Sequence, residues 1–484
     1  MMTIMNHKDD NHKLADKMVR GITPSLILLL MMAWCFRPSH AETLLDALAL
    51  TYQSNPEIEA QRASLRATDE GVAQALGGYR PSFSLGYSAN YDYINYDNAQ
   101  TTTSDTDRTI SLAAEQNLYD FGKTKIGIEA AEDSVTAGRA NLLNVEQSIL
   151  LQAASAYLSL LQNQAILTLR EKNLVRLQYQ NQAAQDRFQV GEVTKTDVGI
   201  ASSRLAQARA DLVSAKGALQ ISMATYMRVV GHEPSQLSEN INTIEIPLNM
   251  PASRETLIEQ SLLYNPELAT SRYVYHQALS QAKAADIALY PDVSFSASLS
   301  QADNVAGRGV ESHGYALGVN LSVPLYQSGI VAAQARAAKS SAVSAMHQLS
   351  ATRKNVIETA HQAWERYHAT LSLVEALLES LQASQLVLEG TEQEAMLGLR
   401  TVLDVLDAEQ DVMDDEVNLV SAKHDLILAK INIAVSLGNF HAKALNLPVT
   451  LYDPHQHYLQ SKQAWFGHDA EQGVYQPKSS VIGQ

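Results

Sequence analysis

The chain contains a single cysteine, Cys35, and it lies in an N-terminal segment that we expect to be removed. A disulfide framework, a thiol nucleophile and a thiolate zinc site are therefore excluded from the mature chain. No His-Glu-x-x-His pattern, phosphate-binding loop or dinucleotide glycine pattern occurs in the sequence either. The sequence thus predicts a protein that is not an enzyme and that uses no cofactor and no metal.

Proline is absent from two long stretches, residues 82–233 and 325–447. An interior proline costs a helix about 3 kcal/mol, so these stretches are free to form long helices. The first expected helix, 123–189, would be on the order of 100 Å long at about 1.5 Å per residue. The full set of expected helices is 123–189 and 331–395, which are long, and 198–230 and 405–437, which are shorter, with Gly191 and Gly398 at the turns between them.

Aromatic residues make up only 6% of the chain, and alanine, leucine, glutamine and serine dominate. This composition is typical of long helices with small packing contacts. Basic residues are also scarce: the formal net charge is −16. Five of the 36 basic and three of the 52 acidic residues lie in residues 1–41, so removing that segment shifts the charge to −18. Nucleic acid is therefore not expected as a partner.

Residues 1–41 have the features of an export signal. Lys8, Lys13, Lys17 and Arg20 precede an apolar run at 26–32, and Ser39-His-Ala41 supplies small residues before an expected cleavage at Glu42. The alternative is a membrane anchor, but the run is shorter than the about 20 residues that span a bilayer. We find no later apolar run of that length, so a membrane role for the mature chain must rest on strands.

One structural unit is written twice in the sequence. Asn55-Pro56-Glu57 returns as Asn265-Pro266-Glu267, and the Gly191 to Asp197 stretch returns in altered form at Gly398 to Asp404. A period near 200 residues exceeds the about 20 to 50 of solenoid repeats, which indicates duplication of a whole domain half. We expect a first repeat at 42–240, a linker at 241–254, a second repeat at 255–447 and a polar, flexible tail at 448–484. We assign His455 and His457 to this tail rather than to a metal site.

Four segments alternate apolar and polar residues with a period of two, at about 82–94, 109–119, 292–300 and 315–323. Each is about ten residues long, the length of a tilted strand that crosses a bilayer. Polar loops are expected between the strands of each pair, at about 95–108 and 301–314.

Four strands cannot close a barrel, and an open edge in lipid leaves backbone groups unsatisfied at several kcal/mol each. Closure therefore requires other chains: two protomers would give eight strands and three would give twelve, and a lumen continuous with a helical tunnel favours the larger number. The soluble alternative is four half-buried strands that cap a helical bundle.

The motifs together resemble the TolC family of outer-membrane efflux ducts over nearly the whole mature chain. The residues that carry the resemblance are Ser54-Asn-Pro-Glu57, Tyr79-Arg-Pro81, Gln116-Asn-Leu-Tyr-Asp-Phe-Gly122, Arg187-Phe-Gln-Val-Gly191, Thr196-Asp197, Val323-Pro-Leu-Tyr326 and Gly398-Leu-Arg-Thr-Val-Leu-Asp-Val-Leu-Asp407. The resemblance implies an α+β membrane protein: a homotrimer with a twelve-stranded outer-membrane barrel, continued by a helical barrel into the periplasm, with an equatorial belt between.

The resemblance also places a periplasmic entrance at the helix turns, where Gly191 and Gly398 lie. Asp404 and Asp407, three residues apart at the start of a helix, would face the same way and give six carboxylates in a trimer. Such a ring attracts cations, resists anions and should raise some carboxylate pKa values through like-charge repulsion. The alternative is a solvated acidic face stabilised by the helix dipole.

The gate of the entrance is likewise implied by resemblance: Arg400 would bind Thr196 and Asp197 across neighbouring coils. Arginine suits this role because its planar fork meets a carboxylate and a hydroxyl together. Ala395 stands where the best-known member of the family has a tyrosine in the same clasp. The closed state is therefore expected to be held more weakly or by different contacts.

The sequence predicts a passive duct in the outer membrane of a Gram-negative bacterium, extending into the periplasm. Its implied partners are outer-membrane lipid, a periplasmic adaptor protein and an inner-membrane transporter, either an ABC exporter or a proton-driven pump. The cargo would be a secreted protein, small toxic compounds or both; we lean towards protein secretion, although no residue supports that preference. The alternative from another class is a periplasmic helical scaffold without a pore.

Overall fold

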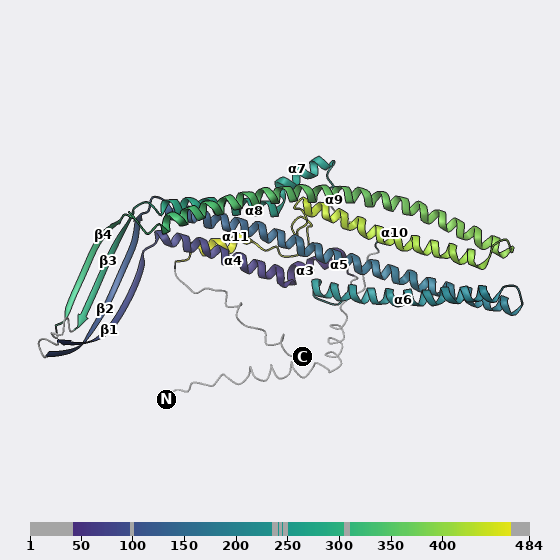
Figure 1. The fold of residues 1–484 in the computed structure, drawn as a ribbon, viewed down its shortest axis with the longest axis horizontal. Coiled ribbons are helices and arrows are strands. Elements are labelled where there is room, and N and C mark those ends of the chain that lie inside the picture. The colour runs from purple at the N-terminus through teal and green to yellow at the C-terminus, as the bar shows by residue number, and fades with distance from the viewer. Residues whose placement is uncertain are drawn as a thin grey trace, which may run out of the picture.

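The protein is elongated, with its strands at one end and turns between helices at the other (Figure 1). The computed structural model describes residues 42–465 except 97–100, 235–240, 242–243, 245–249 and 304–309. The expected signal peptide, half of the expected linker at 241–254 and the last residues of the expected tail lie outside this part of the chain.

The strands form one antiparallel sheet in the order β1-β2-β3-β4. Their bounds are β1 Ser82–Tyr96, β2 Thr101–Tyr119, β3 Asp292–Asp303 and β4 Ser312–Ser322. The predicted loop at 95–108 is wrong over most of its length, because β1 and β2 stay paired from Ser82 and Glu115 to Tyr96 and Thr101. Threonines near the start of β2 favour strand structure although they are polar, so polarity alone misplaced this boundary. The loop predicted at 301–314 is also too long, since β3 and β4 each occupy one of its ends.

Two sets of helices flank the strands, and the element order of the first set is repeated in the second. The order α4-β1-β2-α5-α6 returns as α8-β3-β4-α9-α10. The bounds are α4 Pro56–Leu76, α5 Lys123–Gln189, α6 Lys195–Val230, α8 Pro266–Ile287, α9 Ile330–Met396 and α10 Val402–Ser436. Both α6 and α10 begin three residues before the predicted starts at 198 and 405, because Thr194 and Thr401 cap them earlier.

Glycines in the left-handed region mark equivalent turns in the two halves. The pairs are Gly122 and Gly329, Gly191 and Gly398, and Gly231 and Gly438, each separated by 207 residues, with φ between 74° and 98°. Side chains with a Cβ rarely adopt this conformation, so glycine is the residue that allows each turn at low cost. Phe121 and Ser328, immediately before the first pair, share a positive φ as well.

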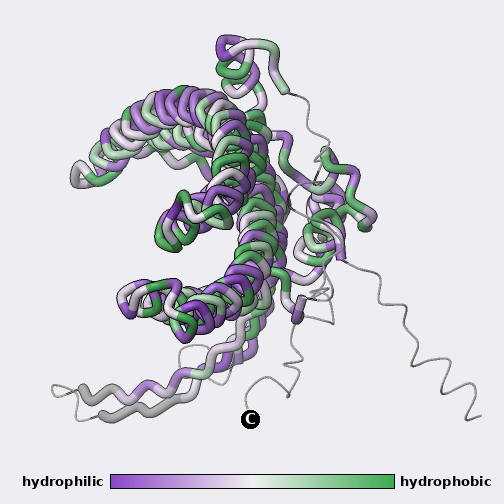
Figure 2. Tube along the Cα trace, turned by 90° about the vertical axis from the view of Figure 1, so that its right-hand side faces the viewer, coloured by the Kyte–Doolittle hydropathy of each residue, from purple (hydrophilic) through white to green (hydrophobic). Residues whose placement is uncertain are grey.

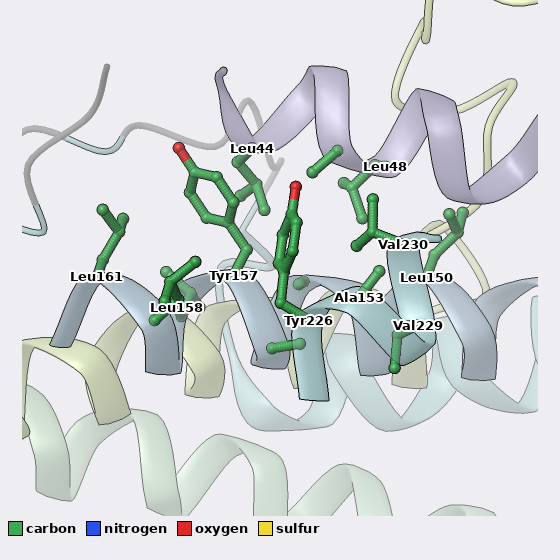
Figure 3. Close-up of a cluster of buried hydrophobic side chains, with 14 of the residues drawn as sticks. Leu44, Leu48, Leu150, Ala153, Tyr157, Leu158, Leu161, Tyr226, Val229 and Val230 are labelled. Carbon is green, nitrogen blue, oxygen red and sulfur yellow. The ribbon is translucent and has the colours of Figure 1, made fainter. Parts of the chain in front are cut away.

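The long helices form a curved wall, and shorter segments lie on its convex side (Figure 2). The shorter helices are α3 Leu44–Ser54, α7 Arg254–Tyr264 and α11 Pro454–Gln463. The largest core cluster lies near the middle of the molecule and contains residues of α3, α5, α6, α10 and the segment 440–449. Figure 3 shows Tyr157 and Tyr226 in this cluster, below Leu44 and Leu48 of α3. Both tyrosine rings are fully buried.

The predicted flexible tail at 448–484 is wrong for its first part. Residues 454–463 form α11, which packs on α4, and the side chain of Asp453 caps the helix by accepting a hydrogen bond from the His455 amide nitrogen. Asp-Pro is a strong helix-start signal, because proline at the first helical position has its φ already set. The His457 ring lies against Asp69 of α4, with Nδ1 3.1 Å from Oδ2. Residues 466–484 lie outside the described part.

The statement that no later apolar run is long enough to cross a membrane was too strong. By length and composition, α9 is apolar enough to cross a membrane, and only 6% of its most apolar stretch is buried. This helix nevertheless packs along α8 and α10 as part of the helical wall. Its exposed apolar surface is therefore available to another chain.

Candidate membrane sheet and periplasmic entrance

One face of the sheet is apolar across all four strands. Residues paired across strands lie on the same face, so the register defines rows that run from β1 to β4. One row is Leu85, Leu112, Leu299 and Tyr315, and the next is Phe83, Ala114, Ala297 and Leu317. These side chains are not core residues in the single chain: Leu85 is 76% exposed and Tyr315 is 81% exposed. A continuous apolar face of this kind requires a nonaqueous environment or a partner.

The opposite face of the sheet is built from small and hydroxyl side chains. The intervening rows are Gly86, Ser111, Ser300 and Gly314, and Ser84, Ala113, Ser298 and Ala316. An outward apolar face and an inward polar face are the signature of strands that surround a water-filled channel.

The two outer strands of the described sheet, β1 and β4, each have a single strand neighbour. Each therefore presents one row of backbone donors and acceptors that the other described strands do not pair. In hydrocarbon such groups must be paired, because each one left open costs several kcal/mol. The sheet therefore combines an exposed apolar face with two edges that the described strands leave unpaired.

At the other end of the molecule, two turns carry the entrance residues predicted from the sequence. Gly191 and Gly398 occupy them, each in the left-handed conformation. Close by, Asp197 and Asp404 take part in capping boxes at the starts of α6 and α10. The Thr194 amide nitrogen donates to Asp197 Oδ2 at 2.8 Å. The equivalent bond joins the Thr401 amide nitrogen and Asp404 Oδ2, also at 2.8 Å.

These capping bonds hold the pKa of both aspartates below the ordinary value. In each case the backbone N–H of the threonine three residues earlier is the leading cause, followed by its hydroxyl. In the single chain the pKa of Asp404 is therefore lowered, whereas a ring of carboxylates was expected to raise it. The capping role was missed in the sequence, although Thr194-Lys-Thr-Asp197 and Thr401-Val-Leu-Asp404 both match its pattern.

Asp407 has a partner that the sequence did not suggest. Its Oδ1 lies 2.7 Å from Arg204 Nη2, which joins α10 to α6 across the two halves of the chain. No sequence signal identifies such a pair, because 203 residues separate its members. Asp404 and Asp407 therefore lie near one another but make different contacts.

Arg400 contacts Glu394 within the protomer, with Nε 2.7 Å from Oε2. Glu394 also raises the pKa of the Arg400 guanidinium through this hydrogen bond and its charge. Thr196 lies beside Asp197 in the first turn of α6. The predicted bonds from Arg400 to these two residues join neighbouring coils and stay a prediction. Glu394 is the residue before Ala395, where the resemblance implied a tyrosine. The ion pair of Arg400 and Glu394 therefore lies beside that position.

A buried carboxyl lies between the two helical hairpins and was not singled out in the sequence. Glu409 of α10 is 1% exposed, and Gln180 Nε2 of α5 donates to its Oε1 at 3.3 Å. Its other oxygen has no hydrogen-bond partner among the described residues. Burial raises the pKa of the Glu409 carboxyl, partly offset by Gln180.

Across the described residues, no group of three histidine, cysteine, aspartate or glutamate side chains is placed to hold a metal ion. The contacts near the two helix turns are capping bonds and ion pairs. They can hold helices together or release them, and they form no arrangement of nucleophile and base.

Comparison with known proteins gives the same assignment from several directions. The sequence pattern of a family described as "Outer membrane efflux protein" matches residues 47–232 and again 257–439. The outer membrane efflux protein BepC of Brucella suis biovar 1 (strain 1330) is 34% identical over 428 residues, covering 88% of this chain and 92% of BepC. The outer membrane protein TolC of Escherichia coli (strain K12) is 24% identical over 421 residues, covering 84% of each.

The fold is shared with solved outer-membrane channels. The structure of the outer membrane protein VceC of Vibrio cholerae superposes with a TM-score of 0.70 at 20% identity, covering 82% of this chain and 96% of VceC. The resemblance to the TolC family drawn from the motifs is thereby confirmed. The chain belongs to the outer membrane efflux protein family.

Proposed function

We propose that the protein is the passive outer-membrane duct of a tripartite export system in a Gram-negative bacterium and that it works as a homotrimer. The sheet carries this proposal: its outer face is apolar in every strand, and two of its edges are open. Three copies supply twelve strands, pair all the edges and place the serine- and glycine-rich face around a lumen wide enough for cargo. Outer-membrane lipid then covers the apolar face.

The helical part continues this duct into the periplasm. Each protomer supplies a curved wall whose concave side is free of the short helices (Figure 2). Three such walls enclose a tunnel, and the exposed apolar surface of α9 is covered by a neighbouring protomer. The two halves of each protomer are tandem structural repeats, which the repeated element order and the three glycine pairs support.

The helix turns at Gly191 and Gly398 form the periplasmic entrance. Arg400 closes it by binding Thr196 and Asp197 of a neighbouring coil. It either leaves Glu394 to do so or keeps that contact as well. Asp404 and Asp407 contribute to a carboxylate ring around the opening. This arrangement is supported by the position of all these residues within the same two turns and the helix starts that follow them.

Energy for export comes from partners. A periplasmic adaptor docks on the helices, and an inner-membrane ABC exporter or proton-driven pump drives the cargo. The cargo is a secreted protein, small toxic compounds or both. Deleting the gene and assaying secreted proteins and drug sensitivity in parallel distinguishes these outcomes, and complementation with the intact gene is the control.

Membrane fractionation tests the duct itself. We expect a heat-modifiable trimer in the outer membrane, which runs as a monomer only after boiling. The competing scaffold predicts a soluble, elongated monomer in the periplasmic fraction. That result would reject the proposed duct, because something other than membrane lipid would then have to cover the apolar face of the sheet.

A further inference from the structure

The C-terminal segment is fastened along the helical wall by polar contacts. In α11, His457 contacts Asp69 of α4, while Lys462 Nζ lies 2.9 Å from Glu132 Oε1 of α5. The guanidinium of Arg139, seven residues or about two turns further along α5, lies 4.9 Å from the centre of the Tyr458 ring. Burial raises the pKa of the Asp69 carboxyl, although His457 opposes the rise through its hydrogen bond and charge. The segment is therefore attached at several points.

This attachment lies on the outer side of the wall. Residues of α5 spaced by seven share a side of the helix. On that side Glu132 and Arg139 contact α11, while Glu146 accepts a hydrogen bond from the Ala442 amide nitrogen at 2.7 Å. Further along, Leu150 and Tyr157 pack against α3. Figure 2 shows the short segments only on the convex side of the arc. α11 therefore runs outside the proposed duct, from the middle of the molecule towards the strands (Figure 1).

The last described residues of this segment lie beside the start of the first strand. Arg80, two residues before β1, donates from Nη1 to the Ala464 carbonyl oxygen at 2.7 Å. The same guanidinium lies 4.6 Å from the centre of the Trp465 ring. Trp465 is nevertheless 62% exposed. An indole held by a cation from one side and open on the other is positioned to contact something beyond this chain.

Other exposed aromatic side chains lie, like Trp465, at the end of the sheet where the strands join the helices. All four junctions between strands and helices carry an exposed one: Tyr79 at 52%, Tyr119 at 56%, Tyr290 at 54% and Tyr326 at 85%. Phe121 links two of them, with ring centres 4.8 Å from Tyr119 and 5.5 Å from Tyr290. Tyrosine and tryptophan concentrate where a bilayer meets water, because their rings are amphipathic. The junctions therefore mark the periplasmic surface of the membrane.

We propose that Trp465 is a membrane anchor outside the barrel: its indole enters the phospholipid headgroup region of the inner leaflet, and Arg80 holds it there. The inference rests on the proposed outer-membrane duct. Lipid is the expected occupant because Arg80, which holds the indole, adjoins Tyr79, one of the four exposed tyrosines at the junctions. α11 then acts as a strut between the membrane surface and the middle of the helical wall.

Tryptophan fluorescence tests the proposal directly. The chain has three tryptophans: Trp34 in the expected signal peptide, Trp364 and Trp465. Trp364 packs near α7 in the middle of the molecule. Trp364→Phe therefore leaves Trp465 as the single reporter, and Trp465→Phe leaves Trp364 as the matched control. Each variant is purified as the full protein and reconstituted into phosphatidylcholine vesicles that contain lipid brominated either near the headgroup or near the acyl-chain end.

We expect headgroup-proximal bromine to quench Trp465 about twofold or more above its effect on Trp364, with deep bromine less effective, as for an interfacial ring. Arg80→Ala should lower the quenching of Trp465, because the ring loses its support. Equal quenching of the two reporters would overturn the proposal. So would a Trp465 emission that is already shifted to the blue in lipid-free detergent trimers and does not respond to bromine, since a second copy of the chain would then cover the ring.

Failure of the anchor and failure of the duct are distinguishable. Heat-modifiable trimers of both variants in the outer membrane, with unquenched Trp465, would reject the anchor alone. If neither the unaltered protein nor the Trp364→Phe protein is found in the membrane fraction, the duct is rejected and the anchor with it.

Discussion

Arg204 of α6 and Asp407 of α10 form an ion pair across the two halves of the chain, with Nη2 2.7 Å from Oδ1. The pair joins the hairpin made by α5 and α6 to the hairpin made by α9 and α10 near the proposed entrance. Any widening of the entrance that separates these hairpins must break it. Both side chains are partly exposed, so the pair adds about 1 kcal/mol or less to stability.

Arg204→Ala should therefore widen or destabilise the closed entrance with little loss of folding stability. We expect a higher single-channel conductance in planar bilayers than for the unaltered protein. Arg209→Ala, exposed on the same helix, is the matched control and should leave the conductance unchanged. If Arg204→Ala and Asp407→Asn both conduct as the unaltered protein does, the pair has no role in closure.

Arg400→Ala and Asp197→Ala should also raise the single-channel conductance, because each removes a member of the proposed contact between coils. Asp197 has a second role as a capping residue of α6, so its substitution also loosens the helix start.

Thr194→Ala separates the two roles of Asp197. It removes the hydroxyl of the capping box but leaves the carboxylate for Arg400. We expect the conductance of Thr194→Ala to stay near that of the unaltered protein. If it rises as far as in Asp197→Ala, fraying of the helix explains the opening and the gate contact is not needed.

Leu112→Arg should impair assembly, because Leu112 lies in the apolar row that we assign to lipid. An arginine near the bilayer midplane of a barrel costs about 2 to 4 kcal/mol. Ala113→Arg is the matched control, since the next residue along a strand points to the opposite face. Urea titration of refolded protein in vesicles measures the difference. Equal losses for the two variants would contradict the assignment of the faces.

Glu409→Gln should stabilise the protein near neutral pH. Burial raises the pKa of this carboxyl above its ordinary value of 4.5, so from that pH upward the unfolded chain loses the proton first. Stability therefore falls as pH rises through this window and is lower by a constant amount above the native pKa. Glutamine keeps the hydrogen-bonding shape without the charge.

Thermal unfolding of the trimer between pH 4 and pH 8 measures this effect. The decline with rising pH should be shallower in Glu409→Gln than in the unaltered protein. Glu389→Gln, exposed on α9, is the matched control and should follow the unaltered protein. Parallel curves for Glu409→Gln and the unaltered protein would show that the carboxyl does not titrate in the expected window.

The residues that sequence analysis placed correctly are those governed by local rules. Long helices follow from stretches without proline, strands from alternation, and turns from the glycines at 191 and 398. The errors have local causes too. The start of β2 was placed too late because its first residues are polar threonines. The Asp-Pro helix start at 453–454 was overlooked because the segment around it is polar in composition.

The residues near the two helix turns show which contacts can be predicted from neighbouring residues and which cannot. The capping boxes at Thr194 and Thr401 can be read from four consecutive residues. The pair of Arg204 and Asp407, and the burial of Glu409 against Gln180, cannot, because helices from distant parts of the chain bring these groups together.

By itself the sequence determined the helix and strand types and the family, because hydrophobic period, proline, glycine and short motifs act over a few residues at a time. Only the tertiary structure decided that Leu85, Leu112, Leu299 and Tyr315 share one row and that Trp465 lies beside Arg80. Register and docking depend on which distant surfaces fit together, and no short stretch of sequence contains that information.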